Sequence, residues 1–124
     1  MKKRRKEKVS PVKFPAVFVV SKVVDGDTFK IKEGWQWRGR KGEVVRPTGY
    51  DTPEKGEEGF TESKQRLTDL ILEKEVEIRK AHILDKWGRL VADVFFEEKA
   101  LCDYFPEYGV PLDIYPQEED REGF

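Results

Sequence analysis

Three short polar clusters hold the residues of this 124-residue chain whose types and spacing could do chemistry. The first is DGD at residues 25–27, within the apolar run KVVDGDTFKI, and the second is DTPE at residues 51–54, shortly after Arg46. The third is DKWGR at residues 85–89, which adds a second arginine. Carboxylate and carbonyl oxygens without a soft ligand suit a hard cation such as Ca²⁺, with Mg²⁺ or Mn²⁺ as alternatives.

The arginines indicate what such a cation would act on. A guanidinium fork matches two phosphate oxygens at once, so Arg46 and Arg89 beside a bound cation would hold a phosphate group. A remaining carboxylate can accept a proton from water or orient it. Together these groups meet the needs of phosphodiester hydrolysis, because they neutralise the charge that builds on the phosphorus oxygens and aim the nucleophile.

Each of these residues also has an ordinary structural role. Asp25 suits an Asp-Gly hairpin turn, whereas Asp27 begins the returning strand, where aspartate is disfavoured. Asp51 suits an Asx turn and Glu54 a solvated loop charge, while the two arginines would be surface or ion-pair residues. For each residue taken alone the structural role is favoured. It becomes less favoured only when the three clusters are considered together.

The other candidate residues favour structural roles. His82 is interpreted as a strand residue with a hydrogen-bonded ring. Trp35 and Trp37 are interpreted as cross-strand packing, with base stacking as the alternative. Trp87 is also assigned to packing unless the polar clusters do form a site, in which case it becomes a platform for a base.

Composition limits the class of protein. Hydrophobic residues make up 37% and charged residues 40% of the chain, which suits one very soluble domain. One cysteine and one histidine exclude an internal disulfide and make a Cys/His zinc site untenable. No stretch approaches the roughly 20 apolar residues of a membrane span, so we expect no membrane association. We also expect the protein to be a monomer.

The charge is distributed unevenly along the chain. Residues 1–8, MKKRRKEK, carry +5 and residues 117–124, QEEDREGF, carry −3, which leaves −3 on the body between them. A slightly acidic body argues against wrapping duplex DNA by charge alone. We expect a basic tail over 1–14, one domain over 15–116 and an acidic tail over 117–124. The sequence as it stands favours the cytoplasm, with secretion after loss of a signal peptide as the alternative.

The elements that must position the clusters follow from periodicity. Apolar, β-branched and alternating runs predict strands at 16–24, 27–32, 43–46, 76–84 and 90–96. A helix is expected at about 57–74, a short one from 97 to 105, and a hairpin loop over 33–43. Five strands with a helix after the third predict a mainly β protein, a five-stranded OB-fold barrel with one long helix and a short C-terminal helix.

The three clusters, in this order and with this intervening helix, resemble the staphylococcal nuclease (thermonuclease) family. VVDGDTFKI is similar to the opening hairpin of that family, and Arg46 with GYDTPE to its arginine strand and acidic loop. DKWGRLVADVF is similar to the turn that carries the second arginine. The resemblance covers about residues 17–96, and more loosely extends to 116.

The resemblance implies a calcium-dependent endonuclease that cuts DNA and RNA, prefers single-stranded regions and leaves 3′-phosphates. It implies that Arg46 and Arg89 grip the phosphate, and that Glu54 is the general base or orients the water. It places Ca²⁺ on carboxylates and a backbone carbonyl, with one further acid acting through water, and the nucleotide near three side chains. The implied metal-site residues are Asp27, Asp51, Thr52 through its carbonyl, and Asp25 through water; the implied nucleotide contacts are Lys86, Trp87 and Tyr115.

The chain also departs from the family. Pro47-Thr48 replaces the apolar pair usual after the first arginine, the loop at 50–60 is compact, and prolines interrupt the region after 97. The alignment of Tyr115 is therefore not fixed. The alternative function is a catalytically inactive OB-fold module that binds single-stranded nucleic acid or a protein partner. Such modules tend to lose carboxylates or arginines, whereas all of these positions are filled here.

Overall fold

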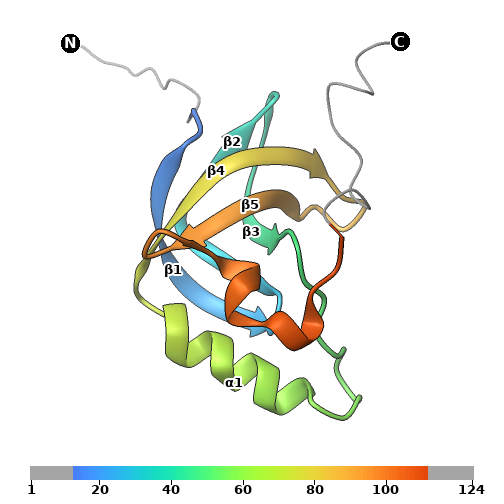
Figure 1. The fold of residues 1–124 in the computed structure, drawn as a ribbon. Coiled ribbons are helices and arrows are strands. Elements are labelled where there is room, and N and C mark those ends of the chain that lie inside the picture. Colours follow the sequence, from blue (N-terminus) through green and yellow to red (C-terminus); the bar gives the residue numbers. More distant parts are fainter. Residues whose placement is uncertain (1–12, 112–124) are drawn as a thin grey trace, which may run out of the picture.

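Strand formation in the computed structural model, which describes residues 13–111, follows the β-branched and aromatic content of the chain. The valine-rich first strand and the apolar strands that follow have one face buried in a common interior. The strands are β1 (Ala16–Asp25), β2 (Thr28–Trp37), β3 (Arg40–Pro47), β4 (Glu75–Leu84), β5 (Leu90–Phe96) and β6 (Lys99–Ala100). Figure 1 shows them wrapped around one another above the helix α1 (Phe60–Ile71).

The sheet closes into a five-stranded barrel of OB-fold type. Its strand order is β3-β2-β1-β4-β5-β6, with antiparallel neighbours, and a parallel pairing of β3 with β5 closes the ring. In that pairing Val45 lies opposite Leu90 and Arg46 opposite Val91. The closure therefore brings Arg46 next to the start of β5, directly after the turn that carries Arg89.

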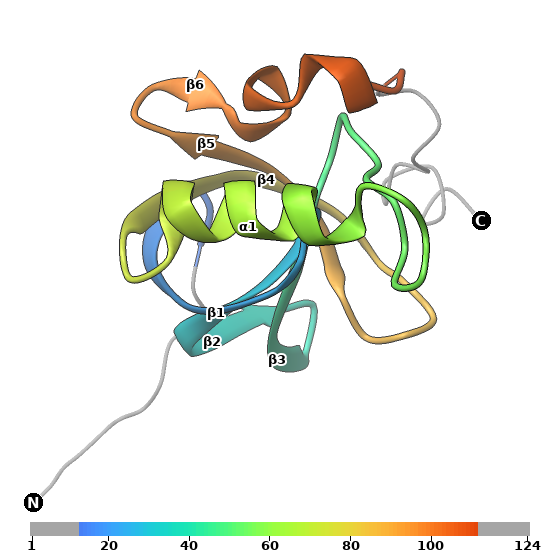
Figure 2. The same cartoon turned by 90° about the horizontal axis from the view of Figure 1, so that it is seen from below.

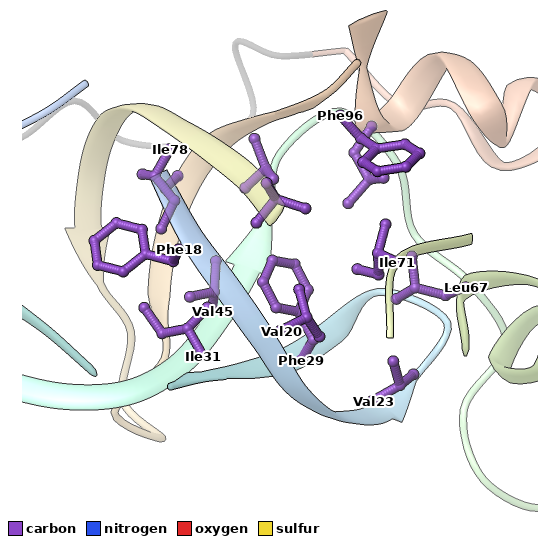
Figure 3. Close-up of a cluster of buried hydrophobic side chains, with 14 of the residues drawn as sticks. Phe18, Val20, Val23, Phe29, Ile31, Val45, Leu67, Ile71, Ile78 and Phe96 are labelled. Atoms are coloured by element: carbon purple, nitrogen blue, oxygen red, sulfur yellow. The ribbon is translucent and has the colours of Figure 1, made fainter. Parts of the chain in front are cut away.

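The helix α1 (Phe60–Ile71) lies across one end of the barrel (Figure 2). Leu67 and Ile71, one turn apart on its inner face, are fully buried against the core. Figure 3 shows them in the same interior as Val23 and Phe29 from the first hairpin. Burial of side chains of this size stabilises the fold by roughly 1.5–3 kcal/mol each. The α-helix in the described residues 13–111 is too short to span a membrane.

The expected hairpin loop at residues 33–43 was wrong. β2 continues to Trp37 and β3 begins at Arg40, so the connection is a two-residue turn at Arg38 and Gly39 with φ of 51° and 78°. The glycines and charges instead mark an irregularity, because Glu33 and Gly34 both adopt positive φ where the register shifts between Lys30 and Trp35.

The expected short C-terminal helix was also wrong. Two residues with positive φ, Glu97 and Glu98, turn the chain into β6, and up to residue 111, where the described part of the chain ends, 3₁₀ turns alone follow: η2 (Leu101–Tyr104) and η3 (Pro106–Tyr108). Pro106 disfavours helical backbone in the residue before it, and Phe105 has φ −132° and ψ 56°. Four residues between β6 and this break allow one 3₁₀ turn and no α-helix.

The other elements lie close to their predicted positions, and two of the predicted structural roles are confirmed. β1, β4 and β5 match within one residue, and α1 is shorter than predicted at both ends. The buried ring of His82 makes a hydrogen bond to Asp93, with 2.8 Å between Nε2 and Oδ1. Trp35 is buried, and its indole N–H donates to the carbonyl oxygen of Val44 at 3.0 Å.

Candidate functional site

The three polar clusters meet at one open cleft of about 580 Å³, a volume in the range of small-ligand sites. The β1–β2 turn, the end of β3, the loop after it and the β4–β5 turn all contribute to its walls. Eight of the predicted site residues line the cleft: Asp25, Asp27, Arg46, Asp51, Thr52, Glu54, Trp87 and Arg89.

Two carboxylates from different turns face the same guanidinium group. Arg46 Nη2 lies 3.1 Å from Asp51 Oδ1 and 3.4 Å from Asp27 Oδ2. Its Nη1 donates to the carbonyl oxygens of Pro47 and Tyr50, at 2.7 Å and 3.0 Å. Arg46 is buried, so it provides the positive charge between the two acids and fixes the path of the chain after β3.

The first acidic turn is packed tightly against the second. The backbone N–H of Thr52 donates to Asp27 Oδ2 at 2.9 Å, which links the two loops directly. Gly26 is required between the two aspartates, because a Cβ atom there would lie 2.7 Å from Ser63 Oγ and 2.8 Å from Thr52 Oγ1. The close approach thus depends on the absence of a side chain.

Tyr50 connects the same loops from beneath. Its side chain is fully buried, and its hydroxyl donates to the carbonyl oxygen of Gly26 at 2.8 Å. Its ring stacks on Phe105, with centroids 4.6 Å apart, and its carbonyl accepts from Arg46. One residue therefore ties the aspartate turn, the arginine and the C-terminal 3₁₀ segment together, immediately before Asp51.

The three aspartates of the cleft differ in proton affinity. Burial and then the neighbouring Asp27 raise the pKa of Asp25 to about 6. Burial also raises the pKa of Asp51, to which the hydrogen bond and charge of Asp27 add, against the opposing effect of Arg46. The pKa of Asp27 is lowered instead, because Arg46 and its hydrogen bonds outweigh burial. Asp27 is therefore the carboxylate that Arg46 stabilises most as an anion, whereas Asp25 and Asp51 hold their protons to higher pH than usual.

The second arginine lies at the other wall and is held by an acid of its own turn. Arg89 Nε donates to Asp85 Oδ2 at 2.7 Å, and Asp85 Oδ1 accepts from the backbone N–H groups of Trp87 and Arg89. Arg89 Nη1 points toward Thr28 Oγ1 at 3.4 Å. Asp85 thus shapes the turn and orients the guanidinium toward the acidic wall.

Trp87 stands at the rim with 69% of its surface exposed. The cationic groups of Lys86 and Arg89 lie 4.7 Å and 4.9 Å from its ring centroid. Lys86 is not among the described residues that line the cleft. Tyr115, the third predicted nucleotide contact, lies outside the described residues, as does the acidic tail at 117–124 and most of the basic tail.

Several residues of the site had no role assigned from the sequence. Lys30 of β2 and Lys55 of the loop line the cleft, and Tyr50 organises it, as does Asp85, which belongs to the third polar cluster. The strand alternation from Thr28 could have placed Lys30 on the cleft side. Nothing in the local sequence predicts Tyr50, because its partners are distant in the chain.

The donor set fits a hard cation with few protein ligands. Asp27, Asp51 and the Thr52 carbonyl offer only oxygen, which suits Ca²⁺ or Mg²⁺ with water completing the coordination. Thr52 Oγ1 is buried and has no hydrogen-bond partner within residues 13–111. Across that part of the chain, no group of three or more Asp, Glu, His or Cys side chains forms a ready metal cage. A cation would therefore depend on two carboxylates and a carbonyl.

Comparison with protein-family models and with curated protein sequences finds no match for this chain.

Proposed function

We propose that this protein is a metal-dependent endonuclease of staphylococcal-nuclease type, which hydrolyses phosphodiester bonds of DNA and RNA. One observation carries the proposal: two acidic turns and two arginines, distant in sequence, line one open cleft, and Asp27 and Asp51 share the guanidinium group of Arg46 there. Oxygen ligands for a cation and guanidinium groups for a phosphate thus face the same opening, as a site for both would require.

Asp27, Asp51 and the carbonyl of Thr52 would hold the cation, and Asp25 would act through a water molecule. The raised pKa of Asp25 and of Asp51 supports this assignment, because a bound cation would offset the burial and the repulsion by Asp27 that otherwise favour protonation. When bound, the cation supplies Lewis-acid stabilisation of charge on the phosphoryl oxygens.

The chain's own groups then have distinct tasks. Arg46 and Arg89 bind the non-bridging oxygens and stabilise the charge of the five-coordinate transition state. Glu54, from the loop that lines the cleft, accepts a proton from the attacking water or orients it. The new bond joins the water oxygen to phosphorus, the bond from phosphorus to O5′ breaks, and the O5′ atom leaves with a proton from solvent. The products are a 3′-phosphate and a 5′-hydroxyl.

The exposed Trp87 at the rim of the cleft favours single-stranded nucleic acid. The exposed Trp87 ring can stack on a base only when that base is free of its own stack and partner. Lys86 beside it adds positive charge outside the cleft. The substrate is therefore single-stranded or fraying DNA or RNA.

A second candidate function is a catalytically inactive OB-fold module that binds single-stranded nucleic acid or a protein. One observation favours it: both Nη atoms of Arg46 and the Nε atom of Arg89 already have protein acceptors. In an inactive module the two arginines would only stabilise the fold through these hydrogen bonds.

Cleavage of denatured DNA separates the two functions. The nuclease proposal expects cleavage with added Ca²⁺, its abolition by EDTA and its recovery on add-back, and loss of cleavage in Arg89→Ala. Arg79→Ala is the matched control, because Arg79 pairs with Glu77 and Glu98 on a surface outside the cleft. Absence of cleavage with every divalent cation, or full activity of Arg89→Ala, would favour the inactive module.

A further inference from the structure

The β2–β3 hairpin extends beyond the barrel, away from α1 (Figure 1). It begins at the candidate cleft, where Lys30 and Val44 are opposite each other and both line the wall. It ends at the turn between Trp37 and Arg40. The hairpin is therefore a continuous surface that connects the cleft with a point well outside it.

The tip of this hairpin has a composition unlike the rest of the body. Residues 35–41, WQWRGRK, contain three basic side chains and no acid, although the body as a whole is slightly acidic. Arg38, Arg40 and Lys41 are exposed, and Trp37 is partly exposed. The acids Glu33 and Glu43 lie at the hairpin base, where Lys30 pairs with Glu43 at 3.6 Å.

Trp37 differs from its neighbour Trp35. Trp35 is buried and its ring covers Gly42, where a Cβ atom would lie 2.8 Å from the ring. Trp37 is opposite Arg40, and the guanidinium of Arg38 lies 5.0 Å from its ring centroid. Trp35 therefore belongs to the core. Trp37 packs against the core but keeps part of its surface exposed, and the exposed arginines beside it are planar groups of the kind that stack on bases.

Strand β3 connects the tip to the cleft wall. Alternate residues of a strand share a face, so Arg40 has the same alternation as Val44 and Arg46, with the Trp35 ring over Gly42 between them. Arg40 is four positions before Val44, a distance of about 13 Å along the strand. A single-stranded nucleic acid bound in the cleft thus reaches the hairpin tip only if the nucleic acid extends several nucleotides beyond the cleft. The β2–β3 face is also a face that OB folds offer to oligonucleotides.

We propose that the hairpin tip, residues 37–41, is a second contact site for single-stranded nucleic acid and binds the strand beyond the cleft. The inference rests on the proposed function in taking the cleft as the place where the strand is cut. Phosphate oxygens pair with Arg38, Arg40 and Lys41, and a base stacks beside Trp37. The site selects polymeric substrates over dinucleotides, because only polymers reach both contacts.

Binding in EDTA tests the tip without cleavage. Fluorescence polarisation would compare labelled single-stranded DNA of 20 and of 3 nucleotides at several salt concentrations. In the variant Arg38→Asn/Arg40→Thr, asparagine tolerates the positive φ of residue 38. We expect 20-mer affinity to fall at least about 5-fold and the salt slope by about 1.4, or 0.7 for each lost contact. Binding of the 3-mer should be unchanged.

The matched control is Lys74→Asn/Lys99→Thr, which removes the same charge from exposed positions outside the cleft and the hairpin. Equal losses in this control and in the hairpin variant, or wild-type binding of the 20-mer by the hairpin variant, would overturn the proposal. No 20-mer binding by the wild type would also overturn it and direct attention to an acidic protein partner.

The outcomes for the two proposals are separate. Cleavage by a hairpin variant that binds the 20-mer like the wild type would reject the tip and keep the nuclease. Tip-dependent binding without cleavage under any cation would reject the nuclease and keep the tip.

Discussion

Arg66 and Arg46 both face carboxylates, and the charge balance around the two differs. Arg66 of α1 forms a one-to-one pair with Glu107, at 3.1 Å between Nη1 and Oε1, and lies over the ring of Phe105. Arg46 instead faces both Asp27 and Asp51, with Asp25 close behind. The first arrangement is balanced, and the second has an excess of acid.

The pKa values follow this balance. The hydrogen bonds from Arg66 lower the pKa of Glu107 to about 2, although that side chain is exposed to solvent. In the cleft, burial and the neighbouring acid raise the pKa of Asp25 to about 6. The Arg66–Glu107 pair thus stabilises its negative charge, whereas Asp25 has no such stabilisation from a cationic partner and would gain it from the proposed cation.

Replacement of the two arginines should separate these roles most strongly. Arg46→Ala should lower turnover on single-stranded DNA by about 10³-fold, because it removes a group that stabilises transition-state charge. Arg66→Ala should leave turnover within about tenfold, since Arg66 holds only the 3₁₀ segment that follows β6. Single-turnover kinetics at saturating Ca²⁺ would measure both. Similar losses in the two variants would show that the difference in charge balance has no functional meaning.

Glu54→Gln should have the next largest effect, a fall in the chemical step of about 10²-fold. The amide cannot accept the proton, and Glu54 is not among the proposed cation ligands, so Ca²⁺ affinity should be kept. Glu58→Gln, an exposed position in the same loop, serves as the control. Wild-type turnover in Glu54→Gln would remove Glu54 from the mechanism.

Stability should depend on pH in opposite directions in the two regions. The stability from neutral Asp25 is full below its usual pKa of 3.8 and is lost as pH rises through about 6. The stability from ionised Glu107 is present above 4.5 and is lost as pH falls toward 2. Thermal unfolding should therefore find Asp25→Asn more stable than the wild type at pH 7, and Glu107→Gln less stable. A change in stability of the same sign for both variants at pH 7 would contradict the proposed difference between the two regions.

Tyr50→Phe should have the smallest effect. It removes the hydroxyl bonded to Gly26 and keeps the ring stacked on Phe105, so the free energy of unfolding should fall by about 1 kcal/mol. If the hydroxyl positions the aspartate turn, Ca²⁺ affinity should also fall a few-fold with KM for DNA unchanged. Tyr108→Phe, in the 3₁₀ turn η3, removes a tyrosine hydroxyl from another position and is the control. A loss of stability with unchanged Ca²⁺ affinity would assign Tyr50 a structural role alone.

The sequence was sufficient for the parts of the fold that depend on local pattern. Valine-rich and alternating runs located β1, β4 and β5, and the apolar face located α1. It failed at residues 33–43, where Glu33-Gly34 looked like a loop and is an irregularity within a long hairpin. Glycine next to charged residues is typical of both structures, and only the pairing with β3 distinguishes them.

The residue types of the site were visible in the sequence, and their connections were not. Asp27, Asp51 and Arg46 are brought together by the barrel, since Arg46 pairs with the start of β5 and the two acidic turns lie against each other. Tyr50 could not be predicted, because its bond to Gly26 spans the two loops. Tertiary packing, rather than local propensity, decides such contacts.

Calcium binding measured by isothermal titration calorimetry tests the central claim most directly. The wild type should bind one divalent cation in the cleft, and Asp51→Asn should lose that binding, whereas Glu107→Gln should keep it. Absence of Ca²⁺, Mg²⁺ and Mn²⁺ binding by the wild type, or unchanged affinity in Asp51→Asn, would contradict the account.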